Sequence, residues 1–279
     1  MFLAYNLRVL AEADFHLSAT DRAFSYGDGL FETCRHEAGR LWFWPDHYAR
    51  LTAGMAALHL NVPADFTTET VYQTVFRLLD ANGLLNGPAR VKIQVWRQTG
   101  GLYTPTSRDA NVLITTQPSP PFAITEKARV GIFDDVGVSH SSVSAYKTLS
   151  ALPYVMAGIA RQTGGYDDMI LLSATSEPAV AECIASNLFW FAEGILHTPT
   201  LKTGCVNGIL RRQLLRAAEQ LGQSVREGFW SPADLSRAEA VFCTNVSGIQ
   251  WLREIDPIGT FPGGHPLADA LFRQVLAAP

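Results

Sequence analysis

One lysine stands where the sequence changes from a polar run to an apolar one. Lys147 follows Ser144-Ala-Tyr and precedes Thr-Leu-Ser-Ala-Leu-Pro-Tyr, which begins an apolar helix. A free lysine has a pKa of about 10.4 and is protonated at neutral pH. A lysine that is immobilised away from water can instead hold a carbonyl compound as a Schiff base. Lys147 is therefore the first candidate for covalent chemistry.

A single carboxylate interrupts an apolar strand in the second half of the chain. Glu182 lies in the run Ala179-Val-Ala-Glu-Cys-Ile-Ala-Ser-Asn-Leu-Phe-Trp. A buried acid needs a partner, and a protonated heterocyclic nitrogen would be a fitting one. The pattern is equally consistent with a glutamate that points to solvent on an alternating strand.

Two segments with small residues could bind an anion. Gly208 precedes a strongly amphipathic helix, and the free amides of Ile209 and Leu210 at such a helix start would suit a phosphate. Thr244 and Asn245 end a strand and could present further donors to the same group. Taken alone, the first segment is more typical of an ordinary capped helix, and the second of a polar turn.

Arg50 closes a helix in Pro45-Asp-His-Tyr-Ala-Arg50-Leu, where an isolated arginine would usually be solvated. Together with Lys147, Glu182 and the two anion sites, it matches the needs of one cofactor. Pyridoxal 5'-phosphate requires a lysine for its aldehyde, a partner for its pyridine nitrogen and a cradle for its phosphate. The combination predicts a pyridoxal-phosphate enzyme.

Composition is consistent with a small ligand. The chain has 279 residues, 47% of them hydrophobic, and a net charge of -4 without a block of like charge. This excludes the usual signature of nucleic-acid or polybasic membrane binding. The four cysteines lie far apart and the histidines show no ligand spacing, so we expect reduced thiols, no metal and a cytoplasmic protein. The apolar runs are too short to span a bilayer.

The hydrophobic patterns predict two domains. In the first, strands are expected at 2–10, at 90–96, at 111–116 and in a hairpin over 30–44, with helices at 45–58 and 68–79, the second capped by Thr67 or Thr68. The prolines of Gln117-Pro-Ser-Pro-Pro121 predict a stiff connector. The expected division is a small α+β domain at 1–117, a connector at 118–122 and a larger domain at 123–279.

In the larger domain, short strands outnumber the helices. Strands are expected at 129–133, 169–173, 179–185, 188–192 and 195–197, with helices near 152–162 and 209–221 and a last helix in the tail. This pattern favours a closed or curled mixed sheet over a doubly wound one. No GxGxxG follows a strand, which disfavours a dinucleotide site.

Seven motifs resemble, in order and spacing, those of class IV aminotransferases, the fold type IV pyridoxal-phosphate enzymes. These are Asp21-Arg-Ala-Phe-Ser-Tyr-Gly-Asp-Gly-Leu-Phe-Glu-Thr33, Arg50-Leu51, Lys147-Thr-Leu, Glu182, Ser186-Asn-Leu-Phe, Thr198-Pro199 and Gly204-Cys-Val-Asn-Gly-Ile-Leu-Arg211. The resemblance covers nearly the whole chain. It implies an α+β fold with a small N-terminal domain, a larger C-terminal pseudo-barrel domain, and a homodimer whose partner contributes to the active site.

The resemblance also assigns roles to individual residues. Lys147 stands where the family has its Schiff-base lysine, and Glu182 where it has the carboxylate that pairs with the pyridine nitrogen. The family binds phosphate at the positions of Arg50, of the Ile209 and Leu210 amides, and of Thr244 with Asn245. Leu210 and Asn245 replace hydroxyl residues often found there, so these contacts are expected to be backbone-only or amide-mediated.

The family includes 4-amino-4-deoxychorismate lyase and branched-chain and D-amino-acid transaminases. Lys147-Thr-Leu-Ser-Ala-Leu, Ser186-Asn-Leu-Phe-Trp-Phe and Cys205-Val-Asn-Gly-Ile resemble the lyase, which is the favoured interpretation. Leu102 stands where the lyase pattern would place an arginine for substrate carboxylates. Tyr26, Arg97 and Tyr103 remain candidate substrate contacts, although Arg97 could equally support the end of a strand. A transaminase and an inactive cofactor-binding relative remain alternatives.

Overall fold

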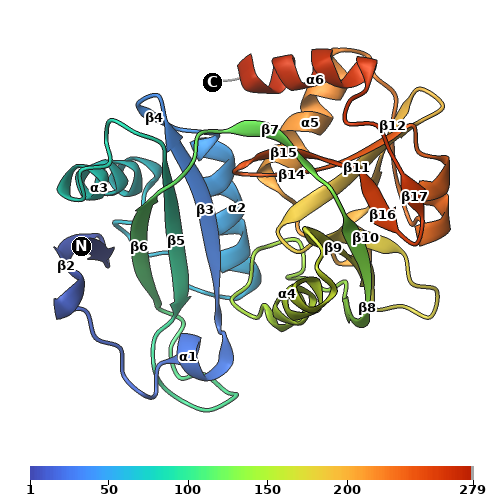
Figure 1. Ribbon diagram of the computed structural model, residues 1–279. Helices are drawn as coiled ribbons and strands as arrows, with labels where there is room; N and C mark the ends of the chain where they lie inside the picture. The colour runs from blue at the N-terminus through green and yellow to red at the C-terminus, as the bar shows by residue number, and fades with distance from the viewer. Residues whose placement is uncertain (278–279) are drawn as a thin grey trace. The chain divides into compact units, whose positions relative to one another are not determined.

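The computed structural model describes residues 1–277, which form two compact units (Figure 1). The first contains Met1–Pro121 and Tyr146–Ser150, and the second contains residues 122–145 and the chain from Ala151 onward. The chain thus passes from the first unit to the second after Pro121, at the end of the proline-rich segment. Residues 146–150, which the sequence-based division places in the larger domain, instead group with the first unit. No helix in the described residues is both long enough and apolar enough to cross a membrane.

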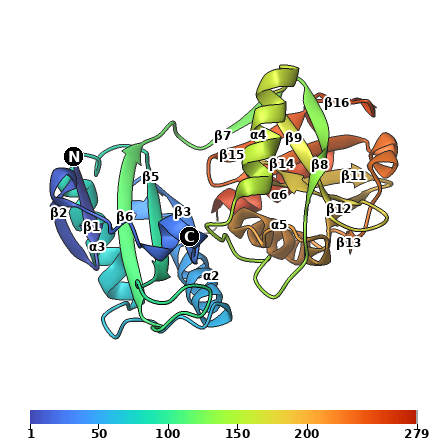
Figure 2. The same ribbon diagram turned by 90° about the horizontal axis from the view of Figure 1, so that it is seen from below.

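The first unit is built on a six-stranded sheet in the order β2-β1-β6-β5-β3-β4. Its strands are β1 (Phe2–Tyr5), β2 (Arg8–Ala11), β3 (Gly29–Glu37), β4 (Arg40–Leu41), β5 (Ala89–Arg97) and β6 (Ala110–Pro118). Its helices are α1 (Arg22–Tyr26), α2 (Trp44–Ala57) and α3 (Thr68–Ala81), with a 3-10 turn at Glu12–Asp14. Helix α2 packs on β3, and α3 packs on β1, β2 and β6 (Figure 2). The apolar faces of the sheet and of both helices form one core.

The sequence predicts most of these elements. The capping box at Thr67 confirms the expected start of α3. The expected hairpin over 30–44 is wrong in its second half, because β4 ends at Leu41 and α2 already begins at Trp44. Pro45 favours this early start, since its fixed φ suits the first turn of a helix. The connector is also shorter than expected, because β6 continues to Pro118.

The second unit is built on a mixed sheet whose main path is β17-β16-β8-β9-β10-β11-β14-β15-β7. Its strands are β7 (Ala123–Lys127), β8 (Val130–Val138), β9 (Asp168–Ser173), β10 (Val180–Cys183), β11 (Ser186–Ala192), β12 (Ile195–Pro199), β13 (Val225–Gly228), β14 (Ala240–Asn245), β15 (Gly248–Leu252), β16 (Glu254–Asp256) and β17 (Gly259–Thr260). Its helices are α4 (Leu152–Gly164), α5 (Ile209–Gln220) and α6 (Pro266–Ala277), with 3-10 turns at Leu201–Thr203 and Pro232–Arg237.

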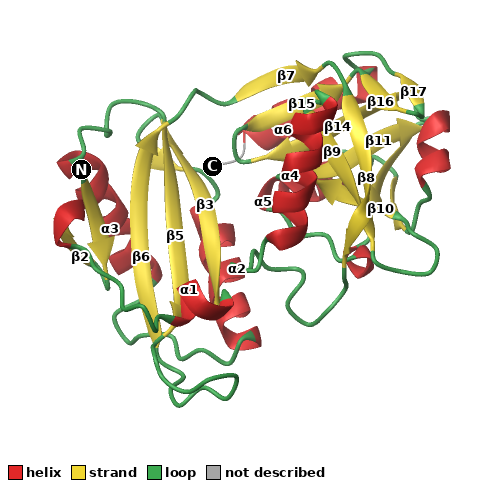
Figure 3. Ribbon diagram, turned by 60° about the horizontal axis from the view of Figure 1, so that its bottom comes forward, coloured by secondary structure: helices red, strands yellow, loops and turns green. Residues whose placement is uncertain are grey.

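Helix α4 lies beside β8 and β9 (Figure 3), and α5 packs against α6. The sheet mixes parallel pairs such as β8 with β9 and antiparallel pairs such as β11 with β14. This confirms the mixed sheet that the sequence predicts. Strands β7, β13, β15, β16 and β17 were not predicted, because they are short and carry no clear alternation.

Candidate active site

The segment that carries Lys147 extends the sheet of the first unit. The Phe31 N–H donates to the Lys147 carbonyl at 2.8 Å, and the Leu149 N–H donates to the Gly29 carbonyl at 2.9 Å. Leu30 and Thr148 form an antiparallel bridge between these bonds. The backbone of Lys147 is therefore fixed against the first residues of β3, which limits the positions that its amine can reach.

The Lys147 side chain lies over an aromatic ring of the same sheet. Its Nζ is 4.9 Å from the centroid of Phe31, and the Nζ of Lys92 is 5.1 Å from the same centroid. Burial, with a smaller effect of Arg90, lowers the pKa of Lys92. The sequence analysis did not select Lys92. The alternation of β5 could have indicated Lys92, because this residue lies on the face opposite the buried Val91 and Ile93.

Arg50 is held from behind by a buried carboxylate. Its Nε donates to Oε1 of Glu32 at 2.7 Å, and its Nη2 lies 2.6 Å from Oε2. The Nδ1 of His47 lies 2.6 Å from the same Oε2. Burial acts to raise the pKa of Glu32, but Arg50 and His47 outweigh it and lower the pKa to about 2. The carboxylate is therefore ionised at any working pH.

Glu32 thus fixes the plane of the Arg50 guanidinium through two parallel bonds. Neither Glu32 nor His47 was assigned this role from the sequence, in which the histidines show only that they lack the spacing of metal ligands. The available signal was alternation along β3, where Glu32 lies between Leu30 and Cys34 on the face that packs under α2. A carboxylate at such a position requires cationic partners.

The candidate substrate contacts separate into a buried and an exposed group. Arg97 is 6% exposed, and its guanidinium bonds Asp28 at 3.0 Å and the Leu58 carbonyl at 2.7 Å. This favours its alternative role in supporting the strand end. Tyr26 and Tyr103 are 39% and 91% exposed, and their ring centroids are 5.6 Å apart. Both tyrosines are therefore accessible to a ligand.

Arg22 anchors the loop before Tyr103, a role that was not predicted from the sequence. Nη1 of Arg22 donates to the carbonyls of Gly100, Gly101 and Leu102, the last at 2.7 Å. The Leu102 side chain is 73% exposed. The loop thus has a fixed backbone and presents an apolar side chain where the resemblance would place a cation.

In the second unit, three polar residues form a row across adjacent strands. Glu182 on β10 pairs with Asn187 on β11, and Asn187 pairs with Thr244 on β14. Directly opposed residues point to the same face of a sheet, so the three side chains share one face. Their neighbours Cys183, Leu188 and Cys243 belong to the apolar core on the other face. A β-bulge between Val180 and Glu182 sets this alternation.

Glu182 is 3% exposed, and its carboxylate accepts hydrogen bonds from a phenol, a backbone N–H and a side-chain amide. The Tyr154 hydroxyl donates to Oε1 at 2.7 Å, the Val206 N–H donates to Oε1 at 3.1 Å, and Nδ2 of Asn187 donates to Oε2 at 3.3 Å. The structure thus supports the buried alternative for Glu182 over the solvent-exposed one. Hydrogen bonds of this kind stabilise a carboxylate without cancelling its charge.

The start of α5 adjoins this row. Gly208 is the N-cap, and a Cβ at Gly208 would lie 2.0 Å from Oδ1 of Asn187, so a side chain there would displace the Asn187 amide. Nδ2 of Asn187 donates to the Val206 carbonyl at 2.7 Å, which fixes the approach to the helix. The amides of Ile209 and Leu210 are in the first turn and have no intrahelical acceptor.

Thr244 and Asn245 differ in what they can offer a ligand. The Thr244 Oγ1 is buried and has no hydrogen-bond partner among the residues that the structure describes. In contrast, the Asn245 side chain donates to Ser186 at 2.9 Å and accepts from the Ser247 N–H at 2.8 Å. The Thr244 hydroxyl can therefore donate to an anionic ligand, whereas the Asn245 side chain already has partners within the protein.

A second buried cluster in this unit lies on the core face of the sheet. Asp168, Cys183 and Cys243 place one ligand atom each within 4.8 Å of one another, and the Lys127 ammonium contacts Asp168 and lies 3.4 Å from Sγ of Cys243. Burial acts to lower the pKa of Lys127, but Cys243 and Asp168 outweigh it and raise the pKa. The ammonium is thus the cation of this cluster. Cys183 and Cys243 are free thiols on strands separated by β11.

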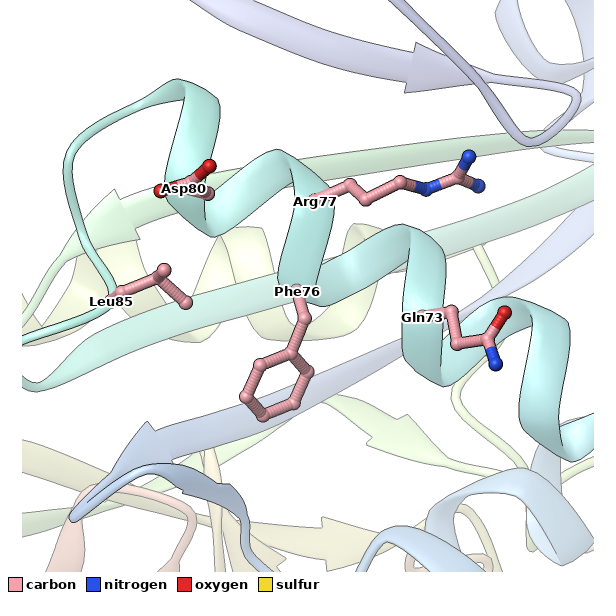
Figure 4. Close-up of a pocket in the computed structure, with 5 residues that line it drawn as sticks. All are labelled: Gln73, Phe76, Arg77, Asp80 and Leu85. Atoms are coloured by element: carbon pink, nitrogen blue, oxygen red, sulfur yellow. The ribbon is translucent and has the colours of Figure 1, made fainter.

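A surface pocket lies elsewhere, on the outer side of α3 in the first unit. It is lined by Gln73, Phe76, Arg77, Asp80 and Leu85 (Figure 4). None of the candidate site residues lines it. Its lining is partly apolar and partly charged.

Residues 29–255 match the model of the amino-transferase class IV family. The chain belongs to this family and is a pyridoxal 5'-phosphate-dependent enzyme. It is 26% identical over 240 residues to an aminodeoxychorismate lyase of Vibrio harveyi, covering 84% of this chain and 85% of the relative. It is 25% identical over 270 residues to a D-alanine aminotransferase of Listeria innocua, covering 94% and 88%.

The fold of this chain is similar to that of solved structures of aminotransferases. The branched-chain amino acid aminotransferase of Escherichia coli superposes with a TM-score of 0.86 over 98% of this chain and 92% of that one, at 20% identity. This confirms the α+β fold type IV architecture that the resemblance implies. The buried Oγ1 of Thr244 and the glycine-capped start of α5 fit the phosphate of the cofactor, and the Glu182 carboxyl group fits its ring nitrogen.

Proposed function

We propose that this enzyme is a 4-amino-4-deoxychorismate lyase, which releases p-aminobenzoate and pyruvate. The observation that carries the proposal is the meeting of two lyase-like motifs around one carboxylate. Asn187 of Ser186-Asn-Leu-Phe-Trp-Phe and Val206 of Cys205-Val-Asn-Gly-Ile both donate to Glu182. The match to the Vibrio harveyi lyase over most of both chains supports the same assignment.

The residues divide the cofactor between them. Lys147 is proposed to hold the aldehyde, and Glu182 to hold the proton on the ring nitrogen. Arg50, the amides of Ile209 and Leu210, and the Thr244 hydroxyl are proposed to bind the phosphate, with Gly208 allowing the close approach and Asn245 contributing at most its backbone. The bound cofactor supplies a conjugated ring that accepts electrons from the substrate carbon that loses its proton.

Lys147 then has a second task as the base. When it is not bonded to the cofactor, the Lys147 amine would be free to remove the proton from the substrate α-carbon. The Lys147 backbone is bonded to β3, and its Nζ lies over Phe31. These contacts restrict the conformations that this flexible side chain can adopt. If Lys147 passed this proton on, transamination would follow, whereas elimination from the substrate would give the lyase products.

The substrate contacts are proposed on accessibility and charge. Tyr26 and Tyr103 are exposed and adjacent, so they can contact the substrate ring. The Lys92 ammonium lies over the Phe31 ring, as the Lys147 ammonium does. Lys92 could therefore bind a substrate carboxylate, because position 102 holds a leucine and not an arginine. Arg97 is left out of this proposal because Asp28 and the Leu58 carbonyl already bind it.

A transaminase for branched-chain or D-amino acids is the second candidate. It is favoured by the match to the D-alanine aminotransferase, which covers 94% of this chain. The absence of an arginine at Leu102 fits this candidate no better, since D-amino-acid transaminases also use basic residues in that loop. The homodimer implied by the family resemblance, with a partner loop completing the site, belongs to both proposals.

The two reactions differ in their need for a second substrate. The holoenzyme is incubated with aminodeoxychorismate alone, and in parallel with D-alanine or L-leucine plus 2-oxoglutarate. The lyase releases p-aminobenzoate and pyruvate without an added oxo acid, whereas strict dependence on an oxo acid identifies a transaminase. Lys147→Arg is the control, because it keeps the charge but cannot form the Schiff base. Turnover of neither substrate by a protein that binds the cofactor would identify an inactive relative.

A further inference from the structure

The Tyr154 hydroxyl makes a short hydrogen bond to the Glu182 carboxylate. This hydroxyl lies 2.7 Å from Oε1, compared with 3.1 Å for the Val206 N–H on the same oxygen and 3.3 Å for Asn187 on the other. The Val206 donor is a backbone N–H that is fixed by the fold, and the hydrogen bond from the Asn187 amide is long. Of these three donors, the Tyr154 phenol is therefore the side chain that acts most strongly on the Glu182 carboxylate.

Helix α4 holds this phenol in place. Tyr154 is half-buried and packs against the cluster of Phe133, Ala157, Leu171 and their neighbours under the helix. Burial, and then the neighbouring Glu182, raise the pKa of Tyr154. The hydroxyl thus remains a hydrogen-bond donor throughout the neutral range, and its ring has little freedom to turn away.

A donor of this kind changes the proton affinity of a carboxylate. Hydrogen bonds to the ionised form stabilise that form and make the carboxylate a weaker base. A weaker base next to a protonated ring nitrogen leaves the proton on the nitrogen. A stronger base would draw the proton to itself and reduce the capacity of the ring to accept electrons.

We propose that Tyr154 is a positioning residue whose hydroxyl keeps Glu182 ionised, so that the ring nitrogen of the bound cofactor stays protonated. The inference rests on the proposed function, because it requires Glu182 to face that nitrogen. Tyr154 itself does not touch the reacting atoms. Its role is carried through the 2.7 Å bond to Oε1 of Glu182.

The second unit contains a matched control. The Tyr166 hydroxyl donates to Oδ2 of Asp256 at 2.8 Å, and burial of this pair is low. Tyr154→Phe and Tyr166→Phe each remove one phenol oxygen from one tyrosine–carboxylate pair. Only the first is expected to affect the cofactor, so a general effect of losing a phenol can be recognised.

The test uses the holoenzyme loaded with ¹⁵N-labelled pyridoxal 5'-phosphate. In wild type and Tyr166→Phe, the ring nitrogen is expected to give the ¹⁵N shift of a protonated pyridine. In Tyr154→Phe it should move toward the shift of neutral pyridine, and the rate of α-proton removal should fall about tenfold, the effect of one hydrogen bond to a charged group. An unchanged shift in Tyr154→Phe contradicts the proposal.

A second variant tests the proposal if Tyr154→Phe fails to fold or to bind the cofactor. Replacement of Tyr154 by a fluorotyrosine preserves the shape and makes the phenol a stronger donor, so the ring nitrogen should keep its proton to a higher pH than in wild type. An unchanged pH dependence of the ¹⁵N shift contradicts the role of Tyr154. Failure of the wild-type protein to bind the cofactor through Lys147, or a neutral ring nitrogen in it, would instead contradict the proposed function.

Discussion

Glu32 in the first unit and Glu182 in the second are both buried carboxylates on strands, 1% and 3% exposed, but their donors differ in charge. Glu32 is held by the Arg50 guanidinium and the His47 ring. Glu182 is held by a phenol, a side-chain amide and a backbone N–H. The Arg50 guanidinium opposes the charge of Glu32 directly, whereas the phenol, the amide and the backbone N–H stabilise the Glu182 carboxylate without cancelling its charge.

The difference separates two functions of the same residue type. A carboxylate neutralised by protein cations serves to orient those cations, here Arg50. A carboxylate stabilised by neutral donors remains an anion that can interact with a positive group on a ligand. The comparison predicts that loss of Glu32 affects stability first, whereas loss of Glu182 affects catalysis first.

Glu32→Gln should have the largest effect on stability. It leaves the buried Arg50 charge without its carboxylate, and breaking a buried pair in this way costs about 3–5 kcal/mol. Urea denaturation of the apoprotein measures the loss of unfolding free energy. Glu37→Gln is the control, because Glu37 forms a more exposed pair with Arg35 on the same strand. Equal stability of Glu32→Gln and wild type would contradict the account of this unit.

Glu182→Gln should have the largest effect on catalysis. Glutamine keeps the shape but cannot hold a proton on the ring nitrogen, and the loss of one such electrostatic group slows turnover by about 100- to 1000-fold. Cofactor affinity should change less than turnover. Single-turnover kinetics and a cofactor titration measure the two effects separately. Loss of binding alone, with normal turnover at saturation, would contradict the assigned role.

The acid sensitivity of the first unit should depend on Glu32. Its pKa falls from the ordinary 4.5 to about 2 on folding, so its contribution to stability is complete above pH 4.5 and is lost as the pH falls toward 2. The shift corresponds to about 3 kcal/mol. Unfolding free energies of wild type and Glu32→Gln, measured from pH 6 down to pH 2.5, should converge as the pH decreases. A constant difference between them would refute this sign.

Thr244→Val should have the smallest effect. The Oγ1 of Thr244 has no partner among the described residues, so its removal should leave stability unchanged or slightly increased. The dissociation constant of pyridoxal 5'-phosphate should rise about tenfold through the loss of one bond to a charged phosphate. Pyridoxal without the phosphate should bind as in wild type. Equal weakening of both compounds would place Thr244 away from the phosphate.

Patterns of local sequence predict much of the fold. The periodicity of 45–58 and 68–79 predicts α2 and α3 within two residues at each end, and the cap at Thr67 is confirmed. Runs of apolar residues predict β5, β6, β9 and β11 in the same way. Local patterns fail where a strand is short and depends on its neighbours, as in β7, which pairs in parallel with β15.

The chemistry of the site is predictable only in part. Lys147 and Glu182 stand out because each is a charged residue in an apolar context, and Glu182 is indeed buried. Tyr154 carries no such signal, because a tyrosine on an apolar helix is usually core packing, and its partner lies 28 residues away. Arg97 shows the converse, since only the structure reveals that Asp28 and a carbonyl already occupy its guanidinium.

The central claim is that Lys147 binds the cofactor covalently, and borohydride reduction tests it most directly. Reduction of the holoenzyme should abolish the yellow absorbance and fix a pyridoxyl group on the peptide that contains Lys147. Lys147→Arg should yield no labelled peptide after the same treatment. A label on another lysine, such as Lys92 on the same aromatic ring, or no label in protein supplied with the cofactor, would contradict the account.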